Sequence, residues 1–148
     1  MTTTPRCNPF DAPGIWLKGA VHVHTTNSDG SAAPADACAF YAARGYDFVC
    51  FGDHWHVTMP EESHGLLLIP GCEIDTWRDD EAGNTHIMCM GADSAPPRPP
   101  DSAPRMGQRE LWALAQATGE YCVFAHPYWS TASPDRIARL PGLYAIEV

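Results

Sequence analysis

The sequence predicts an α/β fold in which short strands alternate with helices, as in a parallel β/α barrel or an open parallel sheet. Apolar runs such as Tyr46–Gly52 have the length and composition of buried parallel strands. Segments between them, such as Gln108–Thr118, have the apolar spacing and the closing glycine of helices. With 148 residues, 45% of them apolar, the chain fits one domain with a sizeable core.

The N-terminal part of the chain is expected to form one β-α-β unit. Met1–Gly14 is rich in threonine and proline, which predicts a loosely packed lead-in, so we expect a lead-in at 1–17 and one domain at 18–148. A proline opens the predicted helix and Gly45 follows its end, as is common at helix termini. The predicted elements are a strand at Trp16–Thr25, a helix at Pro34–Arg44 and a strand at Tyr46–Gly52.

The rest of the chain adds further strands and helices. Pro70-Gly71 interrupts strand-forming sequence, and residues 79–84 form a predicted turn. Gly91–Pro104 contains paired prolines, which exclude a helix or a central strand and predict a long exposed loop. The predicted strands are Leu66–Ile69, Glu73–Trp77, Thr85–Met90, Tyr121–Ala125 and Leu143–Val148, and the predicted helices are Gln108–Thr118 and Pro134–Arg139.

The charge of the chain argues against nucleic acid as a partner. The formal net charge is −9, and the 9 Lys and Arg residues are scattered. Binding to a phosphate backbone normally relies on a basic face. Metal ions could supply positive charge locally, so this argument weakens nuclease activity without excluding it.

Cysteine usage and the lack of targeting patterns indicate a cytoplasmic protein. The 6 cysteines lie in apolar stretches without a Cys-x-x-Cys pair, unlike the dense frameworks of small disulfide-bonded proteins. We therefore expect reduced, mostly buried thiols. The sequence has no apolar signal segment and no apolar run long enough to cross a membrane, so we expect no membrane partner.

The segment Lys18–Ser31 carries the strongest chemical signal. His22 and His24 alternate with valines, so on a strand both imidazoles face the same side. Asp29 lies in the turn that follows. Imidazole and carboxylate groups so spaced are typical of a metal site. The alternative is a pair of surface histidines on an edge strand.

Further histidines and acidic residues follow other predicted strands. In parallel β/α folds, chemistry gathers at the carboxyl ends of the strands. Asp53 and His54 directly follow one strand, and His126 follows another. Glu73 comes just after an apolar run that ends in Pro-Gly. Among these candidates, only His86 falls inside its predicted strand.

Five motifs in this order resemble the polymerase and histidinol phosphatase (PHP) domain family. They are His-Val-His-Thr-Thr-Asn-Ser-Asp-Gly, Gly-Asp-His, Pro-Gly-Cys-Glu, His-Ile-Met-Cys-Met-Gly and Ala-His-Pro, and the resemblance covers Lys18–Val148. It implies a distorted seven-stranded β/α barrel. The family contains phosphatases, nucleases, polymerase proofreading domains and an amidohydrolase-like branch acting on esters. Gly52 departs mildly from the family, in which many members have threonine before the aspartate.

The resemblance also implies a centre of two or three divalent metal ions. His22 and His24 would bind the first metal, and Glu73 would bridge it to a second. His86 and His126 would complete the second metal. These nitrogen and oxygen donors suit Zn, Mn or Fe and do not choose between them.

Three further residues are implied beside these two metals. Asp29 and His54 would bind a third metal. Asp53 would serve catalysis from behind the ligands, by orienting a histidine or the bound water.

A cluster of this kind predicts hydrolysis. Two cations about 3.5–4 Å apart lower the pKa of a bridging water toward 7 and polarise a phosphoryl oxygen. The sequence lacks the Gly-x-Ser-x-Gly elbow of serine hydrolases. We therefore expect a metal-dependent phosphoesterase that uses metal-bound hydroxide on a small phosphorylated molecule. The alternatives are an ester- or amide-cleaving metallohydrolase, with Trp55 on an apolar pocket rim, and a non-catalytic fragment.

The resemblance predicts an incomplete barrel as well. The family's last motif, Asp-x-His, would supply one ligand each to the first and third metals, and it is missing before Val148. We expect an N-terminal fragment that lacks the C-terminal part of the barrel and has an unprotected sheet edge. The isolated chain is then expected to bind metal weakly and to aggregate.

Other polar residues have simpler expected roles. His56 is expected at the pocket mouth or at an exposed loop tip, and His64 in a solvated loop. Glu147 is expected to be a strand-end carboxylate without a metal role. Three arginines could reach a substrate phosphate from rim loops, namely Arg78, Arg98 and Arg105.

Overall fold

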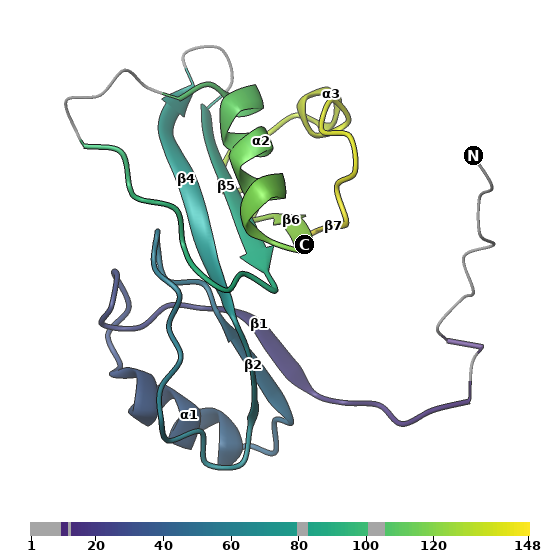
Figure 1. The fold of residues 1–148 in the computed structure, drawn as a ribbon. Helices are drawn as coiled ribbons and strands as arrows, with labels where there is room; N and C mark the ends of the chain where they lie inside the picture. Colours follow the sequence, from purple (N-terminus) through teal and green to yellow (C-terminus); the bar gives the residue numbers. More distant parts are fainter. Residues whose placement is uncertain (1–9, 12, 80–82, 101–105) are drawn as a thin grey trace.

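The computed structural model describes residues 10–11, 13–79, 83–100 and 106–148. It is a mixed α/β fold in which two sheets, β1-β2-β3 and β4-β5-β6-β7, lie edge to edge (Figure 1). In chain order the elements are β1 (Gly19–Val23), α1 (Pro34–Ala42), β2 (Phe48–Phe51), β3 (Leu67–Ile69), β4 (Gly71–Asp79), β5 (Gly83–Met90), α2 (Gln108–Thr118), β6 (Tyr121–Phe124), α3 (Pro134–Ile137) and β7 (Ala145–Ile146).

The first sheet matches the predicted β-α-β unit. Its three strands are parallel, and α1 packs on them through a small apolar core. Burial of these side chains holds helix and sheet together because each removes apolar surface from water. The core residues are Val23, Ala37, Cys38, Val49, Phe51 and Leu66.

The second sheet departs from the prediction. β4 and β5 form an antiparallel hairpin, β6 pairs antiparallel with β5, and β6 and β7 are parallel. The expectation of parallel strands was therefore wrong for β4, β5 and β6. Only residues 80–82 separate β4 from β5, and a parallel pair needs a crossover of a dozen or more residues.

The two sheets meet where the chain after β2 lies beside the start of β4. His54 and Glu73 form an isolated parallel bridge. The backbone N–H of Trp55 donates to the carbonyl of Glu73 at 2.8 Å, and the N–H of Glu73 donates to the carbonyl of Asp53 at 3.2 Å. Backbone hydrogen bonds alone therefore bring three predicted site residues together, namely Asp53, His54 and Glu73.

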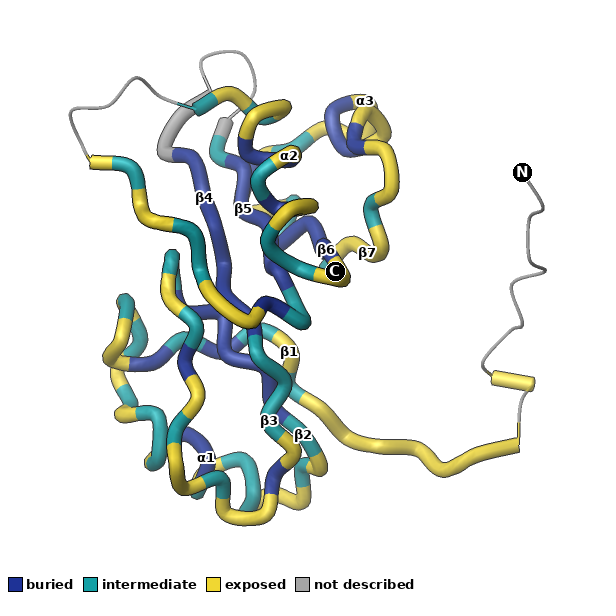
Figure 2. Tube along the Cα trace, viewed as in Figure 1, coloured by how far each residue is buried: buried dark blue, intermediate teal, exposed yellow. Residues whose placement is uncertain are grey.

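Helix α2 has the predicted bounds and covers one face of the second sheet (Figure 1). Leu111, Trp112 and Ala115 are buried against the strands, whose central parts are the most buried of the chain (Figure 2). Gly119 ends the helix at a point of close approach: a Cβ there would lie 2.9 Å from Cys89 Cα. A residue with a side chain would therefore push helix and sheet apart.

Several element boundaries differ from the prediction. The first strand starts at Gly19 rather than Trp16, and residues 13–18 form an exposed arm (Figures 1 and 2). The last strand is only Ala145–Ile146. Residues 92–100 form an irregular loop, as predicted, while residues 101–105 and the tip of the predicted turn lie outside the described residues. No helix within the described ranges is long and apolar enough to span a membrane.

The cysteines match the expectation of reduced, buried thiols wherever the structure describes them. The five free thiols are those of Cys38, Cys50, Cys72, Cys89 and Cys122, and all are buried. Burial, with a smaller effect from Cys72, raises the pKa of the Cys50 thiol to about 12. Thiolate is the reactive form, so the Cys50 thiol is protected by its protonation, and burial shields all five thiols from reagents.

We predict that a Cys7→Ser variant, which leaves these five thiols, shows almost no reaction with dithionitrobenzoate at pH 8 in the folded state. Unfolding in guanidinium should make all five reactive, because it exposes the buried sulfur atoms to the reagent. Titration of absorbance before and after unfolding measures both values. A thiol that reacts at once in the folded protein would contradict this burial.

Candidate metal centre

Glu73, at the start of β4, is the centre of the predicted site. Its side chain is fully buried, yet five imidazoles surround its carboxylate. Oε1 lies 3.0 Å from His86 Nδ1 and 3.1 Å from His126 Nε2. The imidazoles belong to His22, His24, His54, His86 and His126.

The other oxygen, Glu73 Oε2, faces the remaining three rings. His22 Nε2, His24 Nε2 and His54 Nδ1 each lie 3.3 Å from it. His22 in β1 and His24 directly after it point to the same side, as the alternation predicts, and their Nε2 atoms are 3.0 Å apart. The structure thus brings together all five histidines that were predicted as ligands.

Backbone geometry positions His86 and His126, two of the candidate ligands. His126 has a φ of 28°, a left-handed value that is unusual before a proline, and it lies two residues after the end of β6. The backbone N–H of Ala125 donates to the carbonyl of His86 at 3.0 Å, which ties β6 to β5 at this point. Strained backbone of this kind is common where a fold aims a functional side chain.

The loop after β1 brings Asp29 to the edge of the cluster. Gly30 makes this turn possible, because a Cβ there would lie 2.4 Å from the carbonyl carbon of His24. Asp29 Oδ1 lies 3.1 Å from His24 Nδ1, and Oδ2 lies 3.7 Å from His54 Nε2. The structure therefore places Asp29 beside His54, its predicted partner, in an exposed position.

Asp53 lies behind the cluster in a network of hydroxyl groups. Its carboxylate accepts hydrogen bonds from the backbone N–H of Thr25 (2.7 Å) and from the hydroxyls of Thr25 (2.7 Å), Ser28 (2.6 Å) and Thr58 (2.5 Å). Burial would raise the pKa of Asp53, but these donors outweigh it and lower the pKa. The Ser28 hydroxyl also lies 3.3 Å from His24 Nδ1, which links Asp53 to the cluster.

Glu147, for which no metal role was expected, contacts two of the histidines. Its Oε1 lies 2.7 Å from His22 Nδ1, and Oε2 accepts the backbone N–H of His126 at 2.9 Å. Burial would lower the pKa of His22, but Glu147 and Glu73 outweigh it and raise the pKa to about 10. Its place after the last strand, where the other candidates cluster, was the signal that could have identified it.

Asp75 is a second residue that the sequence reasoning missed. Its Oδ2 lies 2.8 Å from His54 Nδ1 and accepts the indole N–H of Trp55 at 3.1 Å. Burial lowers the pKa of His54, but Asp75, Glu73 and Asp29 raise it further than burial lowers it. Asp75 follows Glu73 by two positions on one strand, so the period of two already placed both carboxylates on one face.

The structure also locates the remaining candidates. Trp55 packs against the core under α2 and does not line the cavity at the cluster. His56 contacts Thr58 (3.1 Å), and His64 lies 3.7 Å from Glu62 in a loop. Arg98 is exposed in the loop after β5. The side chain of Arg78 and all of Arg105 lie outside the described part of the chain.

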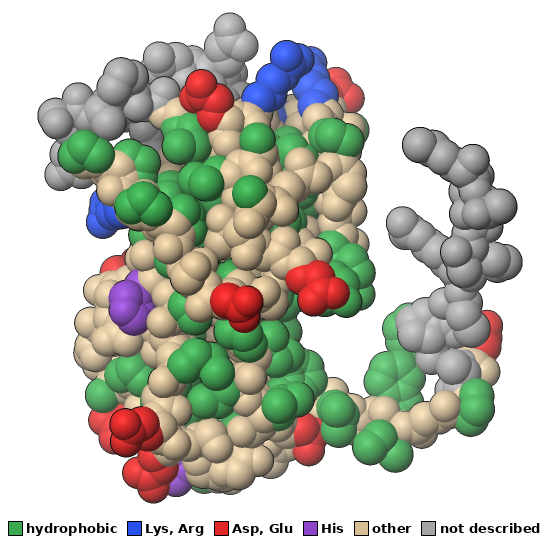
Figure 3. All heavy atoms as spheres, viewed as in Figure 1, with side chains coloured by type: hydrophobic (Ala, Val, Ile, Leu, Met, Phe, Trp, Pro, Cys, Tyr) green, Lys and Arg blue, Asp and Glu red, His purple; other side chains and the backbone are tan. Residues whose placement is uncertain are grey.

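A cavity of about 360 Å³ opens onto the cluster. No lysine or arginine is among the described residues that line it. On the face shown in Figure 3, Lys and Arg side chains are visible at only two places, while carboxylates are scattered. The lining residues are His24, Asp29, His54, Glu73, His86, His126 and Trp129.

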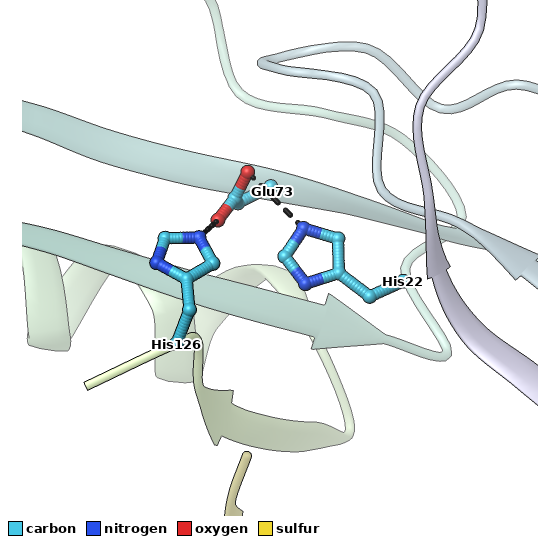
Figure 4. Close-up of side chains that lie close together, drawn as sticks. All are labelled: His22, Glu73 and His126. Atoms are coloured by element: carbon cyan, nitrogen blue, oxygen red, sulfur yellow. Dashed lines mark hydrogen bonds and ion pairs between the residues drawn. The ribbon is translucent and has the colours of Figure 1, made fainter. Parts of the chain in front are cut away.

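The donor set fits divalent metal ions. Two trios, His22–Glu73–His126 (Figure 4) and His24–His54–Glu73, each place one ligand atom per residue within 4.8 Å of the others. Two buried atoms in this cluster, Glu73 Oε2 and His54 Nδ1, make no hydrogen bond despite their close neighbours. Buried polar atoms are rarely left so, and a cation between them would satisfy both. The assignment of each histidine to a particular metal stays a prediction.

Solved structures share the fold, whereas family models and curated proteins gave no match. A candidate metal-dependent phosphoesterase from Bifidobacterium adolescentis is 15% identical, with a TM-score of 0.67 over 88% of this chain and 77% of its own. An amidohydrolase from Chromobacterium violaceum, with bound sulfate and no metal, is 15% identical, with a TM-score of 0.68 over 88% and 76%.

A third match is a two-domain protein from Bacteroides vulgatus that contains a predicted PHP-like metal-dependent phosphoesterase. It is 21% identical, with a TM-score of 0.62 over 89% of this chain and 44% of its own. At these identities the likeness shows a shared mixed α/β fold, the predicted barrel stays a prediction, and a fold alone does not assign an activity.

Gly52 is predicted to be essential for the position of His22. A Cβ on Gly52 would lie 2.7 Å from His22 Cδ2, so a Gly52→Ala variant must displace the ring. The ring can move, so we expect a nearly unchanged melting temperature and a roughly 10-fold weaker binding of Zn²⁺, as for other residues that support a ligand. Calorimetric titration tests this, with Gly14→Ala as control, since a Cβ there meets nothing within 4 Å. Equal affinity in both variants would contradict the crowding argument.

Glu147 is predicted to orient His22. A Glu147→Ala variant removes the acceptor at His22 Nδ1 and should weaken Zn²⁺ binding about 10- to 100-fold, whereas Glu147→Gln keeps an acceptor and should lose less. Equilibrium dialysis measures the affinities, and Glu61→Ala serves as an exposed carboxylate control. If both Glu147 variants bind Zn²⁺ as tightly as the control, the contact has no orienting role.

Proposed function

We propose that this chain is a metal-dependent hydrolase that cleaves a phosphate ester of a small molecule. The observation that supports it best is a single buried carboxylate, Glu73, within hydrogen-bonding distance of imidazoles from several strands at the floor of a cavity. Two of the structural neighbours described above carry the description of metal-dependent phosphoesterase. A cytoplasmic location is part of the same proposal.

In the proposed centre Glu73 would be shared by two cations. His22 and His24 would hold the first, and His86 and His126 would hold the second. Bound cations would supply an activated water molecule and an electrophile for the phosphoryl oxygen. The nitrogen and oxygen donors suit Zn, Mn or Fe. Asp29 and His54 are proposed for a third cation.

Asp53 is proposed as a positioning residue for His24. Because the Ser28 hydroxyl donates to Asp53 at 2.6 Å, its oxygen can accept the N–H of His24 Nδ1 at 3.3 Å. Together with Asp29 Oδ1, which lies 3.1 Å from the same Nδ1, this acceptor would hold the proton of His24 on Nδ1 and leave Nε2, which faces Glu73, free for a metal. Glu147 does the same for His22 through Nδ1.

A second function is favoured by the walls of the cavity. Phosphate sites usually use Arg or Lys donors, and none lines this cavity among the described residues. An ester- or amide-cleaving hydrolase would not need them, and the Chromobacterium violaceum neighbour is an amidohydrolase. We rank this second because bound cations can themselves neutralise a phosphate.

Three substrates distinguish the two functions: 4-nitrophenyl phosphate, bis(4-nitrophenyl) phosphate and 4-nitrophenyl acetate. We expect hydrolysis of a phosphate ester that requires added Mn²⁺ or Zn²⁺ and stops with a chelator. His24→Ala should lower kcat/KM more than about 100-fold, since loss of a ligand exceeds the loss of a supporting residue. His64→Ala, in an exposed loop, is the matched control.

The outcomes point to different conclusions. Metal-dependent cleavage of the acetate alone would favour the second function. Activity that survives in His24→Ala, or that ignores the metal, would contradict the assigned centre. A chain that binds Zn²⁺ but cleaves no substrate would support the non-catalytic alternative.

A further inference from the structure

The loop after β6 is built as a fixed support beside the candidate metal centre. The N–H of Ser130 donates to the carbonyl of His126 at 3.0 Å, and the N–H of Ala132 donates to that of Pro127 at 2.9 Å. Ser130 is buried, and its hydroxyl lies 3.3 Å from His126 Nδ1. The loop is therefore locked to one of the candidate ligands.

This loop presents Trp129 to the cavity. The indole stands at 82° to the ring of His86 and at 85° to that of His126, with ring centroids 5.3 and 5.2 Å away. Trp129 lines the cavity and remains 58% exposed, whereas its neighbour Tyr128 is 97% exposed and does not line it. A large apolar ring left in water beside a reactive cluster gains free energy when another apolar group covers it.

The short distance between Trp129 and the candidate ligands limits which apolar group can cover the indole. The indole contacts the rings of His86 and His126, and His126 Nε2 lies 3.1 Å from Glu73 Oε1. A ring resting on Trp129 must then be joined to the reacting group directly or through one or two bonds. The cavity, at about 360 Å³, is at the small end of ligand sites.

We propose that Trp129 determines specificity by stacking on an aromatic ring attached next to the ester that is cleaved. The substrate class is then a small aryl ester, such as an aryl phosphate, rather than a sugar phosphate or a nucleotide whose base lies far from the phosphate. This inference rests on the proposed function, in that it assumes that the cluster binds the reacting group.

Binding of inert analogues tests the proposal without turnover. Dissociation constants of phenylphosphonate and methylphosphonate are measured by calorimetry on the Zn²⁺-loaded chain. The phenyl compound should bind about 5- to 10-fold more tightly, as expected for one aromatic pair. The indole N–H signal of Trp129 should shift in the NMR spectrum with the phenyl compound only.

The variants separate stacking from general damage. Trp129→Ala should bring the ratio of the two constants close to one, Trp129→Phe should keep part of it, and Tyr128→Ala should leave it unchanged. A phenyl preference that persists in Trp129→Ala, or an equal loss for both phosphonates, would overturn the proposal.

The remaining outcomes distinguish a failure of this proposal from a failure of the proposed function. If neither phosphonate binds, the phosphate-ester function fails, and benzoate and acetate are compared in the same variants. A Trp129-dependent preference for benzoate would keep the aryl specificity for the second function. No aryl preference in either pair would refute it.

Discussion

The burial of the Glu73 charge is the constraint on which this molecule depends. An ionised carboxylate without water is tolerated only when donors or cations surround it. Burial would raise the pKa of Glu73, but the imidazoles of His126, His22 and His24 outweigh burial and hold it well below its ordinary value. Those rings come from different strands and loops. The charge is therefore stable only when the two sheets pack so that these strands and loops meet around Glu73.

Two glycines leave the space that the site side chains need. Gly52 leaves the space that the ring of His22 occupies, and Gly30 lets the loop bearing Asp29 fold against β1. Threonine at position 52 would collide with that ring as it is placed here. The glycine at this position is thus matched to the position of the neighbouring imidazole.

The sequence predicted those parts of the site that depend on local rules. Strand alternation placed His22 and His24 on one face, and strand ends placed His54 and His126 at one rim. The antiparallel pairing of β4 with β5 follows from the short connection between them, whereas the antiparallel pairing of β5 with β6 is set by the tertiary fold across a long connection. The contacts of Glu147 with His22 and of Trp129 with His86 could not be predicted, because these partners are far apart in the chain and only the folded sheets bring them together.

The balance of charge explains why a cation belongs in this cavity. Besides Glu73, the carboxylates of Asp29, Asp75 and Glu147 each lie within 3.1 Å of an imidazole nitrogen of the cluster. His22, whose pKa is raised to about 10, offsets only part of these four negative charges, and the described lining residues include no Lys or Arg. An anionic substrate would be repelled unless positive charge enters with a ligand. Attraction of a phosphate to this site must therefore depend on bound metal, whereas attraction of an aromatic ring to Trp129 need not.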